Sequence, residues 1–514
     1  MARIHCGRVK SFKDPVHGYC DLCDSVASMV DVWVVQRLRW IRQTAFANLV
    51  YHGMEHSRFN HSLGVAHLAR EVLSFVAGNT RLYYSHAPGM DLAEALLNSV
   101  EMFQLASLIH DIGHLPFSHA SEAGILEARS VFEVEGFERV PPRHEEYTYS
   151  LIPLVASIAE DYGIEPVFTS SVADDLSLIL RGVSGGKGIS VFATSWCVTS
   201  ILNRLLAGGL DIDRVDYLLR DSIYAGVRYG VFDADRLIRV ILATPMEIEY
   251  REDNGGGYSI GVSPEYSCSI AVMDKGLSIV ESFLLARFYM HREVYQHRVV
   301  EAYNSLYARL FGLMARDGII SVGDETGSST IAIPLPVDLE RMRRDALDLW
   351  ARLDDIEVLN VLRSIVHGVL GAGEDTRLLA EMLLGRRHPR VVSVIEDRRL
   401  WSAYRAVLQG ARVAGNVDEL LRDVVEFQRE NPLVIVRPLE TDVVSFGQVN
   451  MFYRKEGRIK PLGQGPESSR VAKLAELGLW RVAVYAVKGY EGKAEKVVDL
   501  LSEAKRELGS VERS

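Results

Sequence analysis

The sequence predicts a mainly α-helical protein with a helical core and a smaller α+β lobe at its C-terminal end. Three observations support this fold class. Apolar residues recur with helical spacing over most of residues 26–316. Residues 318–336 are rich in Gly, Ser and Pro, which predicts a boundary between two lobes. Beyond it, helical patterns mix with the short runs "LVIVRP", "VNMFYR" and "WRVAVYAV", which are typical of strands. We therefore divide the chain into a core of residues 1–320 and a lobe of residues 321–514.

Within the core, we expect residues 1–23 to be irregular, with a turn at "KDPVHGY". The segment "MEIEYREDNGGGYSIGV" predicts a hairpin, because its Asn-Gly turn separates two runs suited to strands. Helical patterns cover residues 26–43, 58–77, 90–111, 144–162, 172–181, 195–207, 211–222, 233–242 and one long stretch at 274–316.

In the C-terminal lobe, the same spacing predicts helices around the three short strands. They cover residues 338–350, 376–384, 391–408, 416–430, 468–478 and 491–508.

Composition excludes several classes of protein. The chain has 514 residues, 48% hydrophobic and 24% charged, with a formal net charge of −11. This acidity argues against a sequence-independent nucleic-acid binder. The sequence has neither a stretch of transmembrane length nor a signal peptide, so we expect a cytoplasmic protein without a membrane partner. Five cysteines, an odd number, do not suggest a disulfide framework. Cys20-x-x-Cys23 has the spacing of half a zinc site, but no second pair follows.

The segment "LASLIHDIGHLPFSH" at 105–119 concentrates three histidines and an aspartate within ten positions. A neutral imidazole and a carboxylate are usual ligands of divalent metal ions. Side chains of adjacent helical residues point about 100° apart, so His110 and Asp111 share one ion only near a helix end. Gly113 and Pro116 provide that end.

Two other segments offer polar side chains on one helical face. Arg58 and His61 stand three residues apart at the start of a helical pattern. Asp213, Tyr217 and Asp221 follow at four-residue intervals in "GLDIDRVDYLLRDS". Taken singly, each segment also fits a structural explanation, since helix-end histidines are often structural and aspartates often cap helices.

Together these segments form the pattern H…HD…D, and the chain resembles the HD-domain deoxynucleoside triphosphate triphosphohydrolases. The motifs "SRFNHSLGV", "HDIGHLPFSH", "RHEE", "DIDRVDYLLRD" and "HREVYQHRV" occur in the order of that family. The resemblance spans residues 8–310 and returns more weakly at 431–486, through "NPLVIVRP", "MFYRK" and "WRVAVYA". It implies that the helical core is an HD domain.

The resemblance also implies roles for the clustered residues. One divalent ion, whether Mn, Fe, Zn or Mg, would be held by His61, His110, Asp111 and Asp213. His114 and His144 would contact the triphosphate, and His119 would be the general acid with Glu122 as its acidic partner. Arg58 suits a phosphate clamp, because a guanidinium can bind two oxygens at once.

A second group would hold the nucleoside end of the substrate. Arg287, His291 and Tyr295 recur at four-residue intervals, so a continuous helix would present them on one face. A tyrosine ring under the sugar would leave no room for a 2′-hydroxyl. The sequence departs from the family at Thr44, where a leucine is usual and where a hydroxyl could accept a ribose. The expected substrate-binding residues are Gln43, Tyr217, Asp221, Arg287, His291, Tyr295 and Gln296.

Many members of the family are activated by nucleotides bound between subunits. The matching residues here are Lys10, Asp31, Gln36 and Arg39, which alternatively form a solvated, charged surface. At the second activator position Lys13 stands where mammalian members have Asn. The resemblance thus implies a guanine nucleotide activator and a homodimer or homotetramer.

The sequence therefore predicts metal-dependent hydrolysis of (deoxy)nucleoside triphosphates to nucleoside and tripolyphosphate, by attack of water on the α-phosphate. One alternative is an HD phosphodiesterase or phosphatase acting on another nucleotide. Another is a nucleic-acid-binding scaffold with a vestigial HD site. The helix with "HREVYQH" argues against the first, and the full ligand set and net acidity argue against the second.

Overall fold

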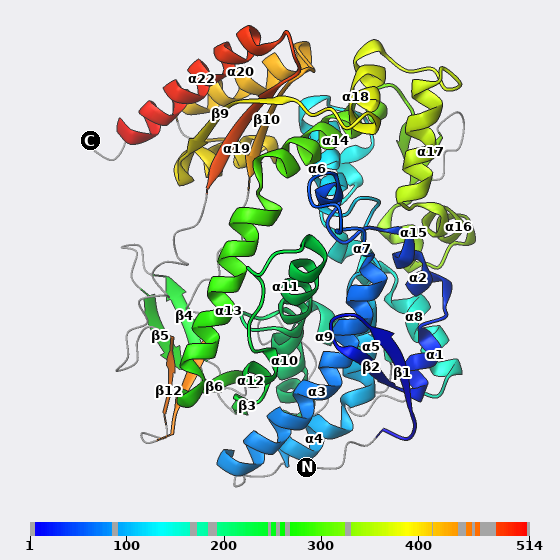
Figure 1. Cartoon of the computed structure of the whole chain (residues 1–514), viewed down its shortest axis with the longest axis vertical. Coiled ribbons are helices and arrows are strands. Elements are labelled where there is room, and N and C mark those ends of the chain that lie inside the picture. Colours follow the sequence, from blue (N-terminus) through cyan, green and yellow to red (C-terminus); the bar gives the residue numbers. More distant parts are fainter. Residues whose placement is uncertain are drawn as a thin grey trace.

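The computed structural model describes residues 6–84, 91–164, 172–182, 193–244, 248–252, 258–262, 268–323, 330–413, 415–439, 449–454, 458–462 and 480–510. Over these residues the chain is mainly helical and its few sheets are small, which confirms the predicted fold class. In Figure 1 the helical core fills the lower and central part of the molecule, and the sheet of the C-terminal lobe lies above it.

The core consists of helices that pack around α3 and α5. Apart from Glu101, every residue of α5 is buried, and α3 packs against α4, α5 and α11. The helices of the core are α1 (Asp24–Met29), α2 (Trp33–Gln36), α3 (Arg58–Tyr84), α4 (Leu92–Asn98), α5 (Val100–Ile109), α6 (His119–Leu126), α7 (His144–Ser150), α8 (Ile152–Asp161), α9 (Val172–Arg181), α10 (Ala193–Ala207), α11 (Ile212–Ala225), α12 (Ala234–Ile238), α13 (Leu277–Met290) and α14 (Arg298–Arg316).

Several predicted helices are broken in the structure. The expected helix at 26–43 is divided into α1, α2 and a 3-10 turn at Arg37–Trp40, because Val32 takes an extended conformation. Residues 144–162 divide into α7 and α8, and a proline stands in the first turn of α8, where its missing N–H costs no hydrogen bond.

The prediction of one long helix over 274–316 is wrong. After α13 the chain makes a π-helical turn, η6 (His291–Tyr295), in which the Gln296 amide donates to the His291 carbonyl at 2.8 Å. His297 then caps α14 by accepting from the Val299 amide at 3.3 Å. Single π turns are frequent at functional sites, and this one carries His291 and Tyr295.

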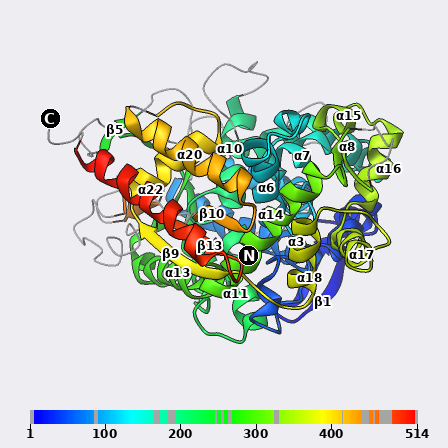
Figure 2. The ribbon, with the colours of Figure 1, turned by 90° about the horizontal axis from the view of Figure 1, so that it is seen from above.

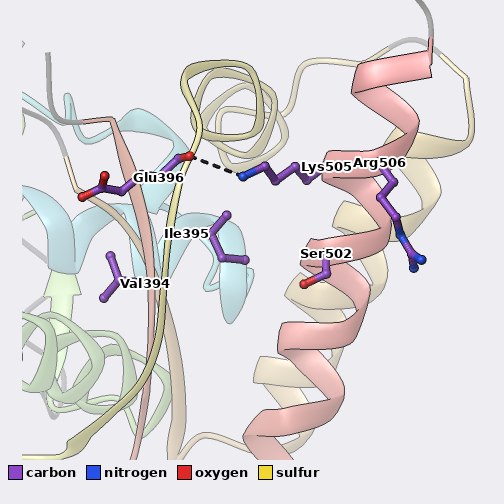
Figure 3. A pocket seen from close by; sticks show the side chains of 6 residues that line it. All are labelled: Val394, Ile395, Glu396, Ser502, Lys505 and Arg506. Atoms are coloured by element: carbon purple, nitrogen blue, oxygen red, sulfur yellow. Dashed lines mark hydrogen bonds between the residues drawn. The ribbon is translucent and has the colours of Figure 1, made fainter. Parts of the chain in front are cut away.

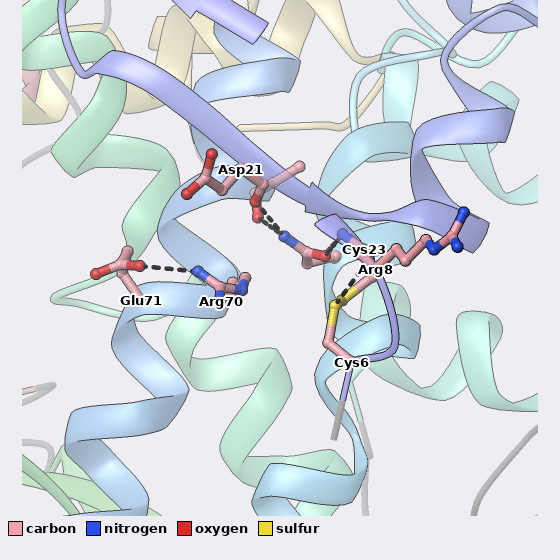
Figure 4. The surroundings of a disulfide bond; sticks show 8 residues. Cys6, Arg8, Asp21, Cys23, Arg70 and Glu71 are labelled. Carbon is pink, nitrogen blue, oxygen red and sulfur yellow. Dashed lines mark hydrogen bonds and ion pairs between the residues drawn. A yellow bond between two sulfur atoms is a disulfide. The ribbon is translucent and has the colours of Figure 1, made fainter. Parts of the chain in front are cut away.

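The prediction that residues 1–23 are irregular is also wrong for the described residues, 6–23. Strands β1 (Val9–Asp14) and β2 (Gly18–Cys23) form an antiparallel hairpin whose turn is the predicted one. Figure 4 shows a disulfide between Cys6 and Cys23 at the open end of this hairpin. A second disulfide joins Cys197 on α10 to Cys268, so four of the five cysteines pair although their odd number did not suggest a disulfide framework. Cys20 is buried and free, and Cys23 is not half of a Cys-x-x-Cys site.

Three further small sheets are formed by the described residues outside the β1–β2 hairpin and the sheet of the C-terminal lobe. The largest has the order β12-β11-β6-β3, so β11 from late in the chain pairs in parallel with β6 from the core. The predicted hairpin is present as β4 paired with β5, and its turn lies outside the described residues. The strands are β3 (Ile241–Thr244), β4 (Ile248–Glu252), β5 (Tyr258–Val262), β6 (Ser269–Met273), β7 (Ile320–Val322), β8 (Ile331–Ile333), β11 (Asn450–Tyr453) and β12 (Arg458–Pro461).

The C-terminal lobe has a three-stranded antiparallel sheet with the order β10-β13-β9. Figure 2 shows α20 and α22 side by side along it. The expected helix at 391–408 is instead a strand followed by α19, because "RVVSVIE" is rich in β-branched residues and Asp397 caps a new helix. The expected helix at 468–478 lies outside the described residues. The elements are β9 (Arg390–Glu396), β10 (Val434–Leu439), β13 (Arg481–Ala486), α15 (Pro336–Glu340), α16 (Arg344–Arg352), α17 (Asp355–Val366), α18 (Glu374–Leu384), α19 (Arg398–Leu408), α20 (Asn416–Glu430) and α22 (Glu491–Ser510).

A buried arginine on α14 connects the core to this lobe. Arg309 donates to Glu127 Oε2 at 2.9 Å, to Gln428 Oε1 at 2.7 Å and to the Val434 carbonyl at 3.1 Å. Because a guanidinium is costly to bury unpaired, these contacts fix the lobe against α14.

Within the described residues, none of the helices is by itself both long enough and apolar enough to cross a membrane. The pair α4 and α5, bent by 53° at their junction, meets the length and composition criteria jointly.

Candidate active site

The four predicted metal ligands converge where the ends of α3, α5 and α11 meet. His61 lies in the first turns of α3, His110 and Asp111 follow the last residue of α5, and Asp213 lies in the first turn of α11. His61 Nε2 is 2.9 Å from Asp213 Oδ1 and 3.8 Å from Asp111 Oδ2. His110 Nε2 is 3.4 Å from Asp111 Oδ1 and 3.7 Å from Asp213 Oδ1. The helix end lets adjacent His110 and Asp111 face one point, as the sequence analysis expects.

The donor set fits a divalent cation. His110 Nδ1 lies 2.7 Å from the Ser107 carbonyl, which fixes the proton on this nitrogen. Its Nε2 is buried and has no hydrogen-bond partner among the described residues. Ligand atoms of His61, His110 and Asp213 lie within 4.8 Å of one another. Two imidazole nitrogens with carboxylate oxygens suit Mn, Fe, Zn or Mg to different degrees.

The carboxylates also set the protonation of the ligand residues. Burial opposes a charge on His61, but hydrogen bonds to Asp213 and Asp216 raise its pKa to about 10. Burial likewise opposes ionisation of Asp111, yet Arg58 and the neighbouring histidines hold the pKa of Asp111 well below its usual range. The site thus keeps its aspartates ionised, which is the form that binds cations.

His114 and His144 approach Asp111 Oδ1, the same oxygen that His110 approaches. His114 Nε2 is 3.4 Å and His144 Nε2 3.9 Å from Asp111 Oδ1, and the two rings stack with centroids 3.5 Å apart. Burial and the charge of Arg58 hold the pKa of His114 well below its usual range, so its imidazole is neutral. By distance alone, Asp111, His114 and His144 could also share an ion.

His119, the first residue of α6, is joined to Glu122 as the motif implies. Its Nδ1 lies 2.9 Å from Glu122 Oε2, while Glu122 Oε1 accepts from the backbone and side chain of His144 at 3.1 and 2.8 Å. Partial desolvation opposes protonation of His119, whose side chain is 70% exposed, but the charge of Glu122 and its hydrogen bond raise the pKa of His119. The ring therefore remains a proton donor at higher pH than a free histidine.

Arg58 is buried and turned toward protein groups. It donates to Asp111 Oδ2 at 2.6 Å, to Ser118 Oγ at 2.7 Å and to the Gln43 carbonyl at 3.3 Å. In this arrangement the guanidinium orients the ligand Asp111. The side-chain oxygens of Gln43 and Thr44 are buried and have no hydrogen-bond partner among the described residues, so they remain available to a ligand.

Of the residues expected at the nucleoside end, Tyr217, His291 and Tyr295 meet beside Asp221. Its Oδ2 accepts from the Tyr295 hydroxyl at 2.6 Å and its Oδ1 lies 2.6 Å from His56 Nε2. The Tyr295 ring contacts the rings of Tyr217 and His291, with centroids 6.2 and 5.0 Å apart. Arg287 is buried on α13, and Gln296 is buried directly after η6.

The four residues expected to bind an activator lie apart from this cluster, on the surface. Lys10 is exposed on β1, and Asp31 and Arg39 are exposed around α2. Arg39 donates to Gln36 Oε1 at 2.7 Å, and its guanidinium lies over the Phe59 ring. Three of the four thus occupy one short stretch of surface, and Lys10 lies on the neighbouring hairpin.

Sequence reasoning missed five buried or half-buried residues that touch the site. They are Asp14, His17, His56, Asp216 and Arg220. Asp216 and Arg220 lie within the motif "DIDRVDYLLRD", and their four-residue spacing was the available signal for an ion pair on one helical face. Asp14, His17 and His56 have partners distant in sequence, so no local signal reveals them.

A hollow in the C-terminal lobe is separate from this site. Figure 3 shows it between β9 and α22, lined by Val394, Ile395, Glu396, Ser502, Lys505 and Arg506. Lys505 Nζ donates to the Glu396 carbonyl across it at 3.4 Å. No histidine, cysteine or aspartate lines this hollow, so it does not share the chemistry of the helix-end cluster.

Residues 58–166 match the family model described as HD domain. The chain is 31% identical to the uncharacterized protein YwfO of Bacillus subtilis over 57% of its own length and 53% of the relative. It is 27% identical to the mouse deoxynucleoside triphosphate triphosphohydrolase SAMHD1 over 69% of its length and 50% of the relative. The chain thus spans about half the length of these curated relatives.

Among solved structures, a phosphohydrolase from Bacteroides thetaiotaomicron has the same fold, with a TM-score of 0.62 and 22% identity. The similarity covers 94% of this chain and all of that one. Residues 58–166 are therefore similar to HD domains, and a larger part of the chain is similar to the curated triphosphohydrolases.

We predict that replacing His110 and Asp111 together with Ala removes bound metal, because too few ligands remain to hold the ion. His119→Ala should retain the metal, since His119 contacts Glu122 rather than the ligand cluster. Metal content after dialysis, measured by inductively coupled plasma mass spectrometry, checks both expectations. Metal loss in His119→Ala would contradict the separation of ligands from the acid.

We also predict that Glu122→Gln lowers the pKa of His119. The amide removes the negative charge that favours imidazolium, so His119 should lose its proton at a lower pH than in the wild type. NMR titration of the His119 ring measures this shift. Glu146→Gln, an exposed change on the neighbouring α7, is the matched control and should leave the titration unchanged. An equal titration in Glu122→Gln and the control would refute the assigned coupling.

Proposed function

We propose that the protein is a metal-dependent phosphohydrolase that cleaves deoxynucleoside triphosphates to deoxynucleoside and tripolyphosphate. The observation that carries this proposal is the convergence of His61, His110, Asp111 and Asp213 beside the His119–Glu122 pair. The relationship to curated triphosphohydrolases supports the same substrate class.

A triphosphate repels an incoming nucleophile, because it carries about four negative charges near neutral pH. A divalent ion held by the four ligands would supply Lewis acidity, offsetting part of this charge and lowering the pKa of water. The chain's own contribution is to hold the ligands in place: Ser107 fixes the tautomer of His110, and Arg58 fixes Asp111.

In the reaction, a bond forms between the water oxygen and the α-phosphorus, and the bond from that phosphorus to the 5′-oxygen breaks. The departing oxygen needs a proton. His119 supplies it from its Nε2, because Glu122 occupies Nδ1 and keeps the ring protonated. The attacking water loses one proton to the solvent as it bonds to phosphorus, which balances the proton given by His119. The products are then a neutral nucleoside and tripolyphosphate.

His114 and His144 contact the phosphates in this proposal. His114 is neutral and buried against Asp111, so it can direct one N–H to a phosphate oxygen without adding a charge. Arg58 contacts Asp111, as His114 does, and the hydrogen bond to Asp111 is the shortest that its guanidinium makes. The phosphate clamp is therefore shared by imidazoles rather than carried by one guanidinium.

The sugar is proposed to lie against Tyr295. Because Asp221 accepts from the Tyr295 hydroxyl at 2.6 Å, the ring is held in one position and can exclude a 2′-hydroxyl by volume. The side-chain oxygens of Gln43 and Thr44, which have no hydrogen-bond partner among the described residues, are proposed to accept from the substrate, and the Gln43 carbonyl accepts from Arg58. Arg287, His291, Tyr217 and Gln296 complete this end.

Activation by a guanine nucleotide at Lys10, Asp31, Gln36 and Arg39 is a further part of the proposal, together with a homodimer or homotetramer. Lysine and arginine suit phosphate, and an exposed aspartate can accept from the Watson–Crick edge of guanine. A nucleotide that contacts two subunits would favour the assembled form by mass action.

We predict that the metal-loaded protein releases tripolyphosphate and deoxynucleoside from at least one dNTP. Anion-exchange chromatography of each dNTP and NTP reaction, with Mn²⁺, Fe²⁺, Mg²⁺ or Co²⁺, identifies the products. His119→Ala should slow the reaction by about 10²–10⁴-fold, the usual contribution of a general acid. Release of pyrophosphate and a monophosphate would instead indicate the rival phosphodiesterase chemistry and overturn attack at the α-phosphorus.

We further predict that GTP or dGTP increases both the rate and the assembled fraction of the wild type, and that Asp31→Ala reduces both effects. A coupling of about 1–3 kcal/mol changes activity roughly 5–150-fold. Sedimentation velocity and initial rates with and without nucleotide test this. If neither quantity responds in the wild type, the four residues are ordinary surface charges.

A further inference from the structure

The buried carboxylate of Asp216 contacts His61, a predicted metal ligand, at Nδ1 rather than at Nε2. The proposed reaction does not use this carboxylate. Asp216 lies on α11 three residues after Asp213 and is fully buried. Its Oδ2 is 2.8 Å from His61 Nδ1, while His61 Nε2 faces Asp213 at 2.9 Å. One carboxylate therefore holds the proton-bearing side of the imidazole, and the other nitrogen points into the ligand cluster.

Asp216 is in turn held by Arg220 on its own helix and by His17 on the β1–β2 hairpin. Arg220, one turn later on α11, donates to its two oxygens at 2.8 and 2.9 Å. His17 Nε2 lies 2.7 Å from Asp216 Oδ1. Arg220 also donates to Asp14 Oδ2 at 2.8 Å. Asp14 and His17 both lie at the turn of the β1–β2 hairpin, about 200 residues earlier in the sequence.

The hairpin turn is itself ordered by Asp14. Its Oδ1 accepts from the backbone amides of Val16 and His17, each at 2.9 Å. At the other end of the hairpin, Gln104 on α5 joins the Cys23 amide and the Asp21 carbonyl at 2.9 Å each. The hairpin is therefore anchored at both ends, and the position of its turn is fixed relative to α5 and α11.

The helix opposite leaves no spare volume around Asp216. A Cβ at Gly64 on α3 would lie 1.9 Å from Asp216 Oδ1 and 2.5 Å from Arg220 Nη2. Glycine is thus required there for the carboxylate to reach His61, which stands three residues earlier on the same helix. The contact depends on close packing of α3, α11 and the hairpin.

We infer that Asp216 is a positioning residue for His61, and that the turn of the β1–β2 hairpin sets the affinity of the metal site through His17, Asp14 and Arg220. The inference rests on the proposed metal-binding role of His61. A carboxylate on the second nitrogen of a ligating imidazole fixes its tautomer and ring orientation and strengthens it as a ligand. Removing the anchors of that carboxylate loosens the imidazole without touching any ligand.

The test is the affinity of the full chain for Mn²⁺, measured by isothermal titration calorimetry, with the visible absorption spectrum of the Co²⁺-loaded protein as a second readout. Asp216→Asn should weaken Mn²⁺ binding about 10–100-fold, as expected for the loss of such a partner. Asp14→Asn and His17→Gln should weaken it in the same direction by a smaller factor, and should alter the Co²⁺ spectrum.

Asp21→Asn is the matched control, because Asp21 lies on the same hairpin. Among the described residues, its carboxylate accepts a hydrogen bond only from the exposed Ser11 hydroxyl, at 2.6 Å. It should bind Mn²⁺ like the wild type. If folded Asp216→Asn also binds like the wild type, Asp216 positions nothing. If Asp216→Asn does not fold, Asp14→Asn and His17→Gln decide, and equality with Asp21→Asn overturns the inference.

The outcome also separates this inference from the proposed function. If the wild type binds no Mn²⁺, the metal site is wrong and the inference fails with it. If the wild type binds Mn²⁺ and the variant lacking His110 and Asp111 side chains does not, the metal site stands, and the hairpin variants test the positioning role alone.

Discussion

The structure depends on the burial of charged side chains where α3, α5 and α11 meet. An ionised carboxylate or guanidinium removed from water is costly unless it is paired and hydrogen-bonded. Asp216 meets this requirement by accepting from His61, Arg220 and His17, and Asp111 meets it through Arg58. The helices must therefore approach one another in one arrangement, which is also the arrangement that gathers the ligand atoms.

The same requirement gives each histidine of the cluster a different character. His110 gives one nitrogen to a backbone carbonyl, and its other nitrogen faces Asp111 and Asp213 without a hydrogen-bond partner among the described residues. His114 is neutral, because burial and Arg58 disfavour a charge, whereas Glu122 favours protonation of His119. Ligand, neutral donor and acid thus arise from one residue type through differences in neighbouring charges.

Segments beyond the core complete the site. Arg37 donates to the carbonyls of Ile112 and His114 and also to that of Leu353, so the loop after α5 is tied to a segment more than 200 residues away. Asp355 accepts from the Phe117 amide at 2.7 Å and from the Arg42 amide at 3.0 Å. Residues of the core and residues after position 320 therefore both hold the candidate site in place.

By itself the sequence determined the helical class, the strands around "LVIVRP" and "WRVAVYAV", and the identity of the clustered residues, because helical spacing and short motifs are local properties. It did not determine the break after η6 or the start of α19, because a π-helical turn and a capping aspartate are not visible in helical spacing alone. It also did not determine the β1–β2 hairpin or β9, which are held by α11 and β13, segments distant in sequence. Only the tertiary structure brought Asp14 and His17 to Asp216, because hydrogen bonds between residues about 200 positions apart leave no periodic signal in either segment.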